Sequence, residues 1–259
     1  VSFRNMFKIT TISFFVNAIV PFRAGEITGA VLLKKTSSVS LIKGLTTIAV
    51  ARLFDLLSLL TIGGLSMIAL NLELSPNLLN ALRVVGILSL ITLTLICISV
   101  IKKDLGLHFL ETLGKNLHIP QRFSQKILRS YGSYVEGVRI LRSRKYLLAT
   151  VLTSIGIWVT FAINYELFFT AFGCPLSLTT MMAAVMIIMI LSIIPLTPGQ
   201  FGAFEAIHSM VLVILGIPFN KALAIAFTIH VFQLIYLAIV SFIAASSMEL
   251  RSVSYTHLR

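Results

Sequence analysis

Charged side chains stand beside proline and glycine at two places inside long apolar stretches of this chain. The first place is Asn17-Ala-Ile-Val-Pro-Phe-Arg-Ala-Gly-Glu26, and the second is Pro195-Leu-Thr-Pro-Gly-Gln-Phe-Gly-Ala-Phe-Glu205. Proline and glycine interrupt helices, so backbone N–H groups and carbonyls lose their helical partners at both breaks. The start of a helix carries a partial positive charge suited to phosphate or carboxylate groups. The two breaks therefore predict contact with a charged ligand.

Arg23, Glu26 and Glu205 add full charges to these breaks. A charge at the bilayer centre costs about 3 kcal/mol or more, and such residues usually serve a function. Interrupted backbone at membrane depth is tolerated only where it is buried in protein or lines a wet cavity. We therefore expect a polar route at the breaks. The alternative is a pair of packing kinks that enclose a buried Arg–Glu pair.

Arg52 and Asp55 are a second charged pair inside an apolar segment. Their spacing of three residues places them on one face of a helix, where they can form an ion pair. The pair is either a structural bridge that locks two helices or part of a pathway for a polar headgroup.

Three further polar residues interrupt apolar segments. Glu166 lies near the end of its segment and faces either a cavity or external water. His230 and Gln233 lie three residues apart in the last segment. A single membrane histidine is either a hydrogen-bonded packing residue or a proton relay.

Signatures of enzymes and metal sites are missing from the sequence. GxSxG, HExxH, P-loop and paired-aspartate motifs are absent, which disfavours catalysis. Cys97 and Cys174 are far apart and belong to no Cys/His cluster, so we expect neither a disulfide, a metal nor another cofactor.

The elements that must position these residues are transmembrane helices. The chain is 57% hydrophobic and 12% charged, whereas soluble domains carry about 25% charged residues. Four apolar runs have about the length needed to cross a bilayer, and they lack the alternation of barrel strands. These runs are Ile48–Leu70, Val84–Ile101, Tyr146–Phe169 and Ala222–Ala245.

Positive charge predicts the topology of these helices. Residues 102–145 contain ten Lys and Arg against three acids. In a membrane protein such a loop is cytoplasmic and contacts anionic lipid headgroups, so the net charge of +12 does not indicate nucleic acid. The linkers 72–81 and 171–177 are then external.

Two apolar segments do not fit single crossings. Ile9–Leu33 and Leu178–Gly216 are each divided by a break into halves of about 13 to 17 residues, which are short for a crossing. We expect two re-entrant helical hairpins, one from the cytoplasm and one from outside; a single kinked crossing is the alternative for the first. The predicted fold is an all-α polytopic transmembrane bundle with two opposed re-entrant hairpins, an arrangement typical of transporters with inverted repeats.

The basic loop 102–145 is predicted to be helical and amphipathic between Asp104 and Arg144. Its apolar residues recur at spacings of three and four, which favours a helix along the membrane surface. These residues are Ile127, Leu128, Tyr131, Tyr134, Val135, Val138 and Leu141.

The chain is expected to form one transmembrane domain over residues 1–251. It starts at Val1 inside a basic segment, so we expect that an N-terminal portion is missing. Residues 252–259 look like a translated adapter and are expected to be an artefactual tail.

The order and spacing of these motifs resemble one family. The first break, then Arg52-Leu-Phe-Asp55-Leu-Leu, then the second break follow one another as in the lysylphosphatidylglycerol synthase transmembrane-region family, also called flippase-like. The family includes the membrane half of the bacterial multiple peptide resistance factor. The resemblance covers nearly the whole chain except the tail, and the second break is its most specific part.

The resemblance implies movement of a lipid with a polar headgroup between leaflets of a bacterial or archaeal cytoplasmic membrane. Its expected partners are the membrane and a phospholipid or other anionic lipid, and a homo-oligomer is compatible with it. The substrate-binding residues that it implies are Asn17, Pro21, Arg23, Gly25, Glu26, Arg52, Asp55, Pro198, Gly199, Gly202 and Glu205.

Two departures from the family pattern are visible. Ala51 stands where the family often has Glu, and Gln200 stands where Gly is common. The first weakens the expected ion pair at Arg52, and the second predicts a looser turn in the second hairpin. Two other functions remain open: a membrane-embedded transferase acting on a lipid or polyprenyl-linked substrate through Glu26 or Glu205, and a scaffold without transport.

Overall fold

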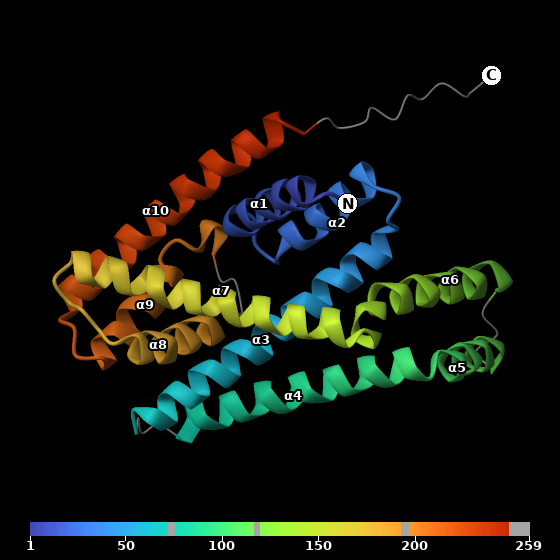
Figure 1. Ribbon diagram of the computed structural model, residues 1–259, viewed down its shortest axis with the longest axis horizontal. Helices are drawn as coiled ribbons and strands as arrows, with labels where there is room; N and C mark the ends of the chain where they lie inside the picture. Colours follow the sequence, from blue (N-terminus) through green and yellow to red (C-terminus); the bar gives the residue numbers. More distant parts are fainter. Residues whose placement is uncertain (72–75, 117–119, 193–196, 249–259) are drawn as a thin grey trace.

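The protein folds as a bundle of helices, as the sequence predicts (Figure 1). The computed structural model describes residues 1–71, 76–116, 120–192 and 197–248. Pro195, which belongs to the second break, and the tail 252–259 lie outside these described residues. No strand occurs in the part of the chain that the structure describes.

Among the described residues, four helices are long and apolar enough to cross a membrane. They are α3 (Leu41–Ala69), α4 (Pro76–Ile101), α7 (Arg144–Ala171) and α10 (Phe219–Ser246). Each contains or largely overlaps one of the predicted crossings. The predicted bounds differ most at the start of α3, which begins at Leu41 rather than Ile48, and at α4, which takes in much of the predicted linker 72–81.

Shorter helices form two further pairs. The helices α1 (Phe3–Ile19) and α2 (Ala24–Thr36) flank the first break, and α8 (Leu178–Leu191) and α9 (Ala203–Ile214) flank the second. The short 3₁₀ helix η2 (Pro198–Gln200) lies within the second break. Both breaks are therefore interruptions of helix, as predicted; the re-entry of the pairs into the membrane stays a prediction.

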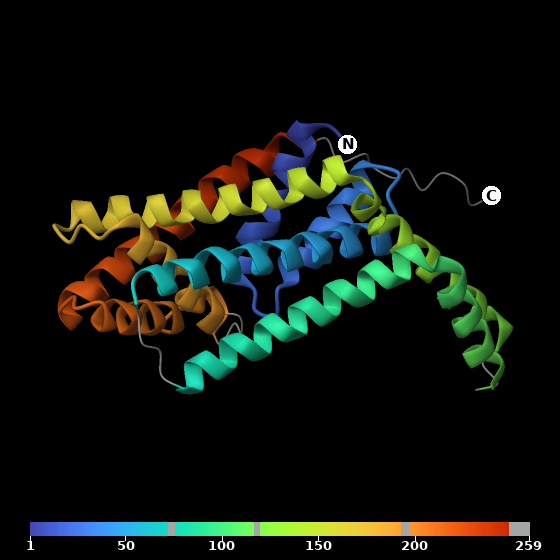
Figure 2. The ribbon, with the colours of Figure 1, turned by 60° about the horizontal axis from the view of Figure 1, so that its bottom comes forward.

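The basic loop 102–145 forms a pair of helices rather than one. The helix α5 (Lys103–Asn116) follows α4 but bends away from it (Figure 2), and α6 (Gln121–Gly137) leads back to the bundle through the 3₁₀ helix η1 (Arg139–Arg142). Figure 2 shows α5 and α6 extending from one end of the bundle. The start of α3, the end of α4 and the start of α7 lie at this same basic end (Figure 1).

The apolar face of α6 packs partly against protein. Val138 is fully buried in a cluster with Val50 and Phe54 of α3. The hydroxyl of Tyr134 lies 2.9 Å from the hydroxyl of Ser99 on α4. The predicted face exists, and its C-terminal half contacts α3 and α4; its position along the membrane surface stays a prediction.

The main core surrounds α8. Met181, Val185, Met186 and Ile188 are buried there among residues of α3, α7, α9 and α10. Met186 lies against Gly63, where a Cβ would overlap the methionine side chain. Small residues at such contacts let membrane helices approach closely, and this core holds the second break in place.

Candidate functional site

The first break joins α1 to α2 through a tight turn. Pro21 lacks an N–H group and so cannot continue α1. Phe22 and Arg23 then adopt left-handed backbone, with φ of 63° and 54°. Single left-handed residues cost roughly 1 kcal/mol when they are not glycine. The strained pair reverses the chain over four residues, Val20 to Arg23.

Side chains at this turn close it from both helices. The Asn17 oxygen accepts a hydrogen bond from the Gly25 N–H at 2.7 Å. The Arg23 guanidinium lies 3.5 Å from the Glu26 carboxylate, and these side chains are 50% and 27% exposed. Arg23 is thus weakly paired and accessible to an anion beside the N-terminus of α2.

Gly25 is required by the close approach of α1 and α2. A Cβ on Gly25 would overlap the backbone oxygen of Ser13, and one on Gly29 would meet the Ser13 side chain. Gly25 lies against Asn17 and the Ser13 backbone, and Gly29, one turn later, lies against the Ser13 side chain. This order of contacts shows that the two helices are antiparallel. The pair is a helical hairpin whose turn carries the charges.

The second break is a turn built from left-handed residues. Gly199, Gln200 and Gly202 have φ of 64°, 55° and 78°. The Gln200 N–H donates to the Thr197 carbonyl at 3.0 Å, and the Thr197 hydroxyl donates to the Phe201 carbonyl at 2.9 Å. Gln200 therefore occupies a backbone conformation that favours glycine, and these hydrogen bonds close the turn.

Glu205 holds this turn to the start of α9. One carboxylate oxygen accepts the Gly202 N–H at 2.7 Å. The other lies 2.6 Å from Nδ1 of His230 on α10. Glu205 is buried, as is His230, so the carboxylate and the imidazole form a pair away from the surface.

A second histidine, His208, lies beside this pair. Its Nδ1 is 2.7 Å from the Phe204 carbonyl, and its Nε2 is 2.7 Å from the Tyr165 hydroxyl on α7. The Phe204 ring lies between the imidazoles of His208 and His230, with centroids at 3.6 Å and 4.3 Å. The sequence analysis missed His208 and Tyr165; the signal for His208 was its position three residues after Glu205 in a short helix.

A family model, the lysylphosphatidylglycerol synthase transmembrane region, matches residues 1–241. The chain belongs to this family. The match confirms the resemblance that the two breaks indicated and spans both of them, together with His208 and His230. The chain is thus a multi-pass membrane protein of a family related to lipid modification or transport. No curated protein and no solved structure gives a significant match to the chain.

The Arg52–Asp55 pair of this family member lies on α3. The Arg52 guanidinium is 3.1 Å from the Asp55 carboxylate. The other carboxylate oxygen accepts a hydrogen bond from Ser154 of α7 at 2.6 Å, and the Asp55 carbonyl accepts one from the Trp158 indole at 2.7 Å. Asp55 thus links α3 to α7 through Ser154 and Trp158, and a role of the Arg52–Asp55 pair in a headgroup pathway stays a prediction.

Arg52 also reaches the first hairpin. Its guanidinium lies over the Phe14 ring of α1, 5.1 Å from the ring centre. Phe14 stands about one turn before Asn17 on the same helix. Among the described residues, hydrogen bonds and ion pairs join the predicted site residues in four pairs, which are Asn17 with Gly25, Arg23 with Glu26, Arg52 with Asp55, and Gly202 with Glu205. In this described part of the chain, no hydrogen bond or ion pair between side chains connects one of these pairs to another.

The second break of the family member lies against the first hairpin. The helix η2, which contains Pro198 and Gly199, packs against α1. The two interrupted segments therefore meet, although they are far apart in the sequence.

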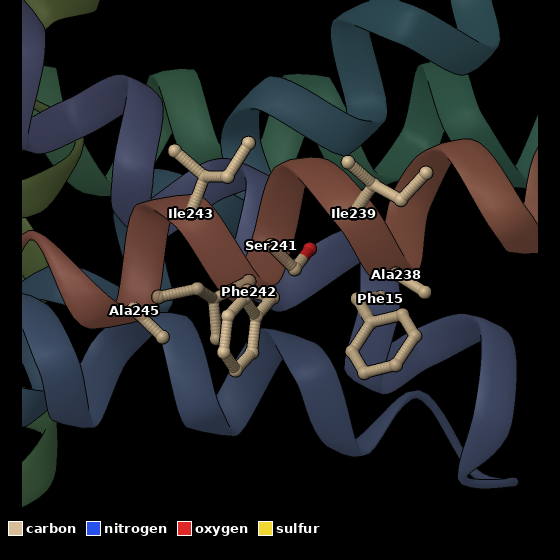
Figure 3. Close-up of a pocket in the computed structure, with 8 residues that line it drawn as sticks. Phe15, Ala238, Ile239, Ser241, Phe242, Ile243 and Ala245 are labelled. Carbon is tan, nitrogen blue, oxygen red and sulfur yellow. The ribbon is translucent and has the colours of Figure 1, made fainter.

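An apolar groove of about 600 Å³ lies between α1 and α10 (Figure 3). Ile12 and Phe15 line it from α1, and Ile239, Phe242 and Ile243 line it from α10. The exposed fractions of Ile239, Phe242 and Ile243 all exceed one half, so the groove opens outward. Its lining has the apolar character of a surface that contacts acyl chains.

Proposed function

We propose that this protein moves a lipid with an anionic headgroup across the cytoplasmic membrane. The observation that carries the proposal is the contact between the turn of the second hairpin and α1 of the first. It brings two interrupted segments, each with a charged side chain at its break, next to each other inside an apolar bundle. Backbone of this kind is found in membranes where it lines a cavity or a substrate path.

Arg23 is the residue that we assign to the phosphate of the headgroup. Its side chain is half exposed, and its contact with Glu26 is 3.5 Å long. A guanidinium binds phosphate through paired hydrogen bonds that are shorter than this contact. A phosphate therefore competes well for Arg23, and the N-terminus of α2 adds a partial positive charge beside it.

The groove between α1 and α10 supports a path for the tails. It lies along α1, the helix that leads into the first break, and Phe15 of its lining is two residues before Asn17. A lipid whose headgroup is at the first break can keep an acyl chain in this groove. The headgroup then moves through protein while the tails stay in an apolar surrounding, which avoids the cost of exposing them to water.

The direct test measures leaflet exchange of fluorescent phosphatidylglycerol by the purified chain in proteoliposomes. We expect exchange above that of empty vesicles, and a loss of about tenfold for Arg23→Ala, because a charged hydrogen bond contributes about 1.5 kcal/mol or more. The matched control is Arg129→Ala, which removes an exposed arginine from α6. Equal rates for the wild type and Arg23→Ala would remove Arg23 from the path, and no exchange of any anionic lipid would remove the transport function.

A further inference from the structure

The Glu205–His230 pair is a buried acid–base pair at the turn of the second hairpin. The two side chains are 11% and 4% exposed, and the Glu205 oxygen lies 2.6 Å from His230 Nδ1. An ionisable pair within a membrane bundle is expensive to bury and is a candidate functional site. With a neutral imidazole that donates from Nδ1, the pair carries one negative charge. With one more proton on the imidazole, it becomes a neutral ion pair.

Both ring nitrogens of the neighbouring His208 have hydrogen-bond partners when its imidazole is uncharged. The Phe204 carbonyl can only accept, so Nδ1 of His208 carries the hydrogen at that contact. Nε2 then accepts the hydrogen bond from the Tyr165 hydroxyl. A proton added to His208 would force Tyr165 to give up this donation, and Tyr165 is buried. The extra proton therefore belongs at His230 rather than His208.

Other charged side chains lie on the helices around the Glu205–His230 pair, and within the part of the chain that the structure describes no hydrogen bond or ion pair joins them to it. On α7, Glu166 accepts a hydrogen bond from Thr170 at 2.8 Å. On α10, Lys221 stands in the first turn, nine residues before His230. The helix α8 contains no titratable side chain. On α1, Arg4 and Lys8 lie in its first two turns, and Lys8 donates to the Ser247 carbonyl at the far end of α10.

We propose that the Glu205–His230 pair is a proton-binding site that couples the turn of the second hairpin, and through it lipid movement, to protons. The coupling to lipid rests on the proposed function; the proton site itself does not. The ligand is a single proton, taken from water by His230 and returned to water when the pair reverts to its negative form.

The geometry connects this site to the turn in two ways. The Glu205 carboxylate accepts the hydrogen bond from the Gly202 N–H in the turn. A change in the charge next to this carboxylate therefore changes the strength of that hydrogen bond. The Phe201 ring lies 5.1 Å from the His230 ring and is itself 56% exposed. Phe201 therefore covers His230 on the side of the surface. An imidazolium draws the carboxylate toward itself, weakens its hold on Gly202, and so frees the turn that packs against α1.

The first experiment follows the proton site without any lipid transport. Phe201→Trp places a tryptophan beside His230, where an imidazolium quenches indole fluorescence. In nanodiscs we expect the fluorescence that Phe201→Trp adds to that of the native Trp158 to fall as the pH is lowered from about 9 to about 4, a range that brackets the ordinary pKa values of histidine and glutamate. The fall should be lost with His230→Gln and retained with His108→Gln, which removes an exposed histidine from α5.

A second measurement guards against a destabilising effect of the tryptophan. Nitrogen NMR of histidine-labelled chain should show, beside the signals of exposed histidines such as His108, a further ring signal that responds to pH in the same range, disappears with His230→Gln and shifts with Glu205→Gln. The proton site is overturned if the fluorescence response is absent or survives His230→Gln, and likewise if no titrating ring signal is lost with His230→Gln.

The coupling to lipid is tested by an imposed pH difference across proteoliposomes that contain fluorescent phosphatidylglycerol. If one proton moves per lipid, one pH unit should change the leaflet ratio by about tenfold, and His230→Gln should abolish this change. Exchange that ignores the pH difference would overturn the coupling. Absence of exchange in every variant would instead overturn the proposed function, and the fluorescence would still decide on the proton site.

Discussion

The side chain of Asn17 on α1 accepts a hydrogen bond from the backbone N–H of Gly25 on α2, across the first break. Helices leave their first N–H groups without partners, and a side-chain oxygen that accepts from one of them acts as a cap. Here the cap comes from the preceding helix instead of the residue before the helix. Asn17 therefore stabilises both the start of α2 and the reversal of the chain.

Replacement of Asn17 by leucine should destabilise the first hairpin. The side chain keeps a similar volume but loses the acceptor, so the Gly25 N–H is left without its partner at a cost of about 1–2 kcal/mol. Unfolding of the purified protein in mixed micelles measures this loss. Asn80→Leu, at an exposed position of α4, is the control, and equal stability of both variants would show that the cap contributes nothing.

Gly25→Ala should be more disruptive than an alanine at an open glycine. The new Cβ would overlap the Ser13 backbone oxygen, which cannot move without separating α1 from α2. We expect a loss of about 2 kcal/mol or more in the same assay. Gly64→Ala on α3 has open space around it, and it should be neutral or should stabilise by up to about 1 kcal/mol. The reverse order of the two variants would contradict the close approach.

Asp55→Ala should loosen the contact between α3 and α7. The change removes the acceptor of Ser154 and the partner of Arg52 together. Because a hydrogen bond to a charged group contributes about 1.5–3 kcal/mol, we expect a loss of about 3 kcal/mol. Asp104→Ala on α5, where the aspartate is exposed, should change the unfolding midpoint little. An unchanged midpoint for Asp55→Ala would show that the bridge does not lock the helices.

Tyr165→Phe should cost about 1–2 kcal/mol, because it leaves Nε2 of the buried His208 without its donor. Tyr146→Phe is the matched control, since the Tyr146 side chain is exposed at the start of α7. Thermal unfolding followed by circular dichroism compares the two. A loss that is no larger for Tyr165 than for Tyr146 would rule out the hydrogen bond as a source of stability.

The sequence alone predicted the features that depend on residues close together along the chain, namely the long helices, the helix breaks and one ion pair. Length and hydropathy predicted the four long helices, because a crossing helix must be continuously apolar. The positions of proline and glycine predicted both breaks, since these residues interrupt a helix where they occur. The spacing of three predicted the ion pair of Arg52 and Asp55 within one helix.

Contacts between helices required the tertiary structure. His230 meets Glu205 across 25 positions of sequence, and Ser154 meets Asp55 across 99. A helix in lipid is apolar on nearly all sides, so its sequence lacks the one-sided pattern that tells which face packs inward. In α6 that pattern is present, and its apolar face was predicted. In α7, α9 and α10 the polar partners are set by helix rotation and register, which only the packed bundle decides.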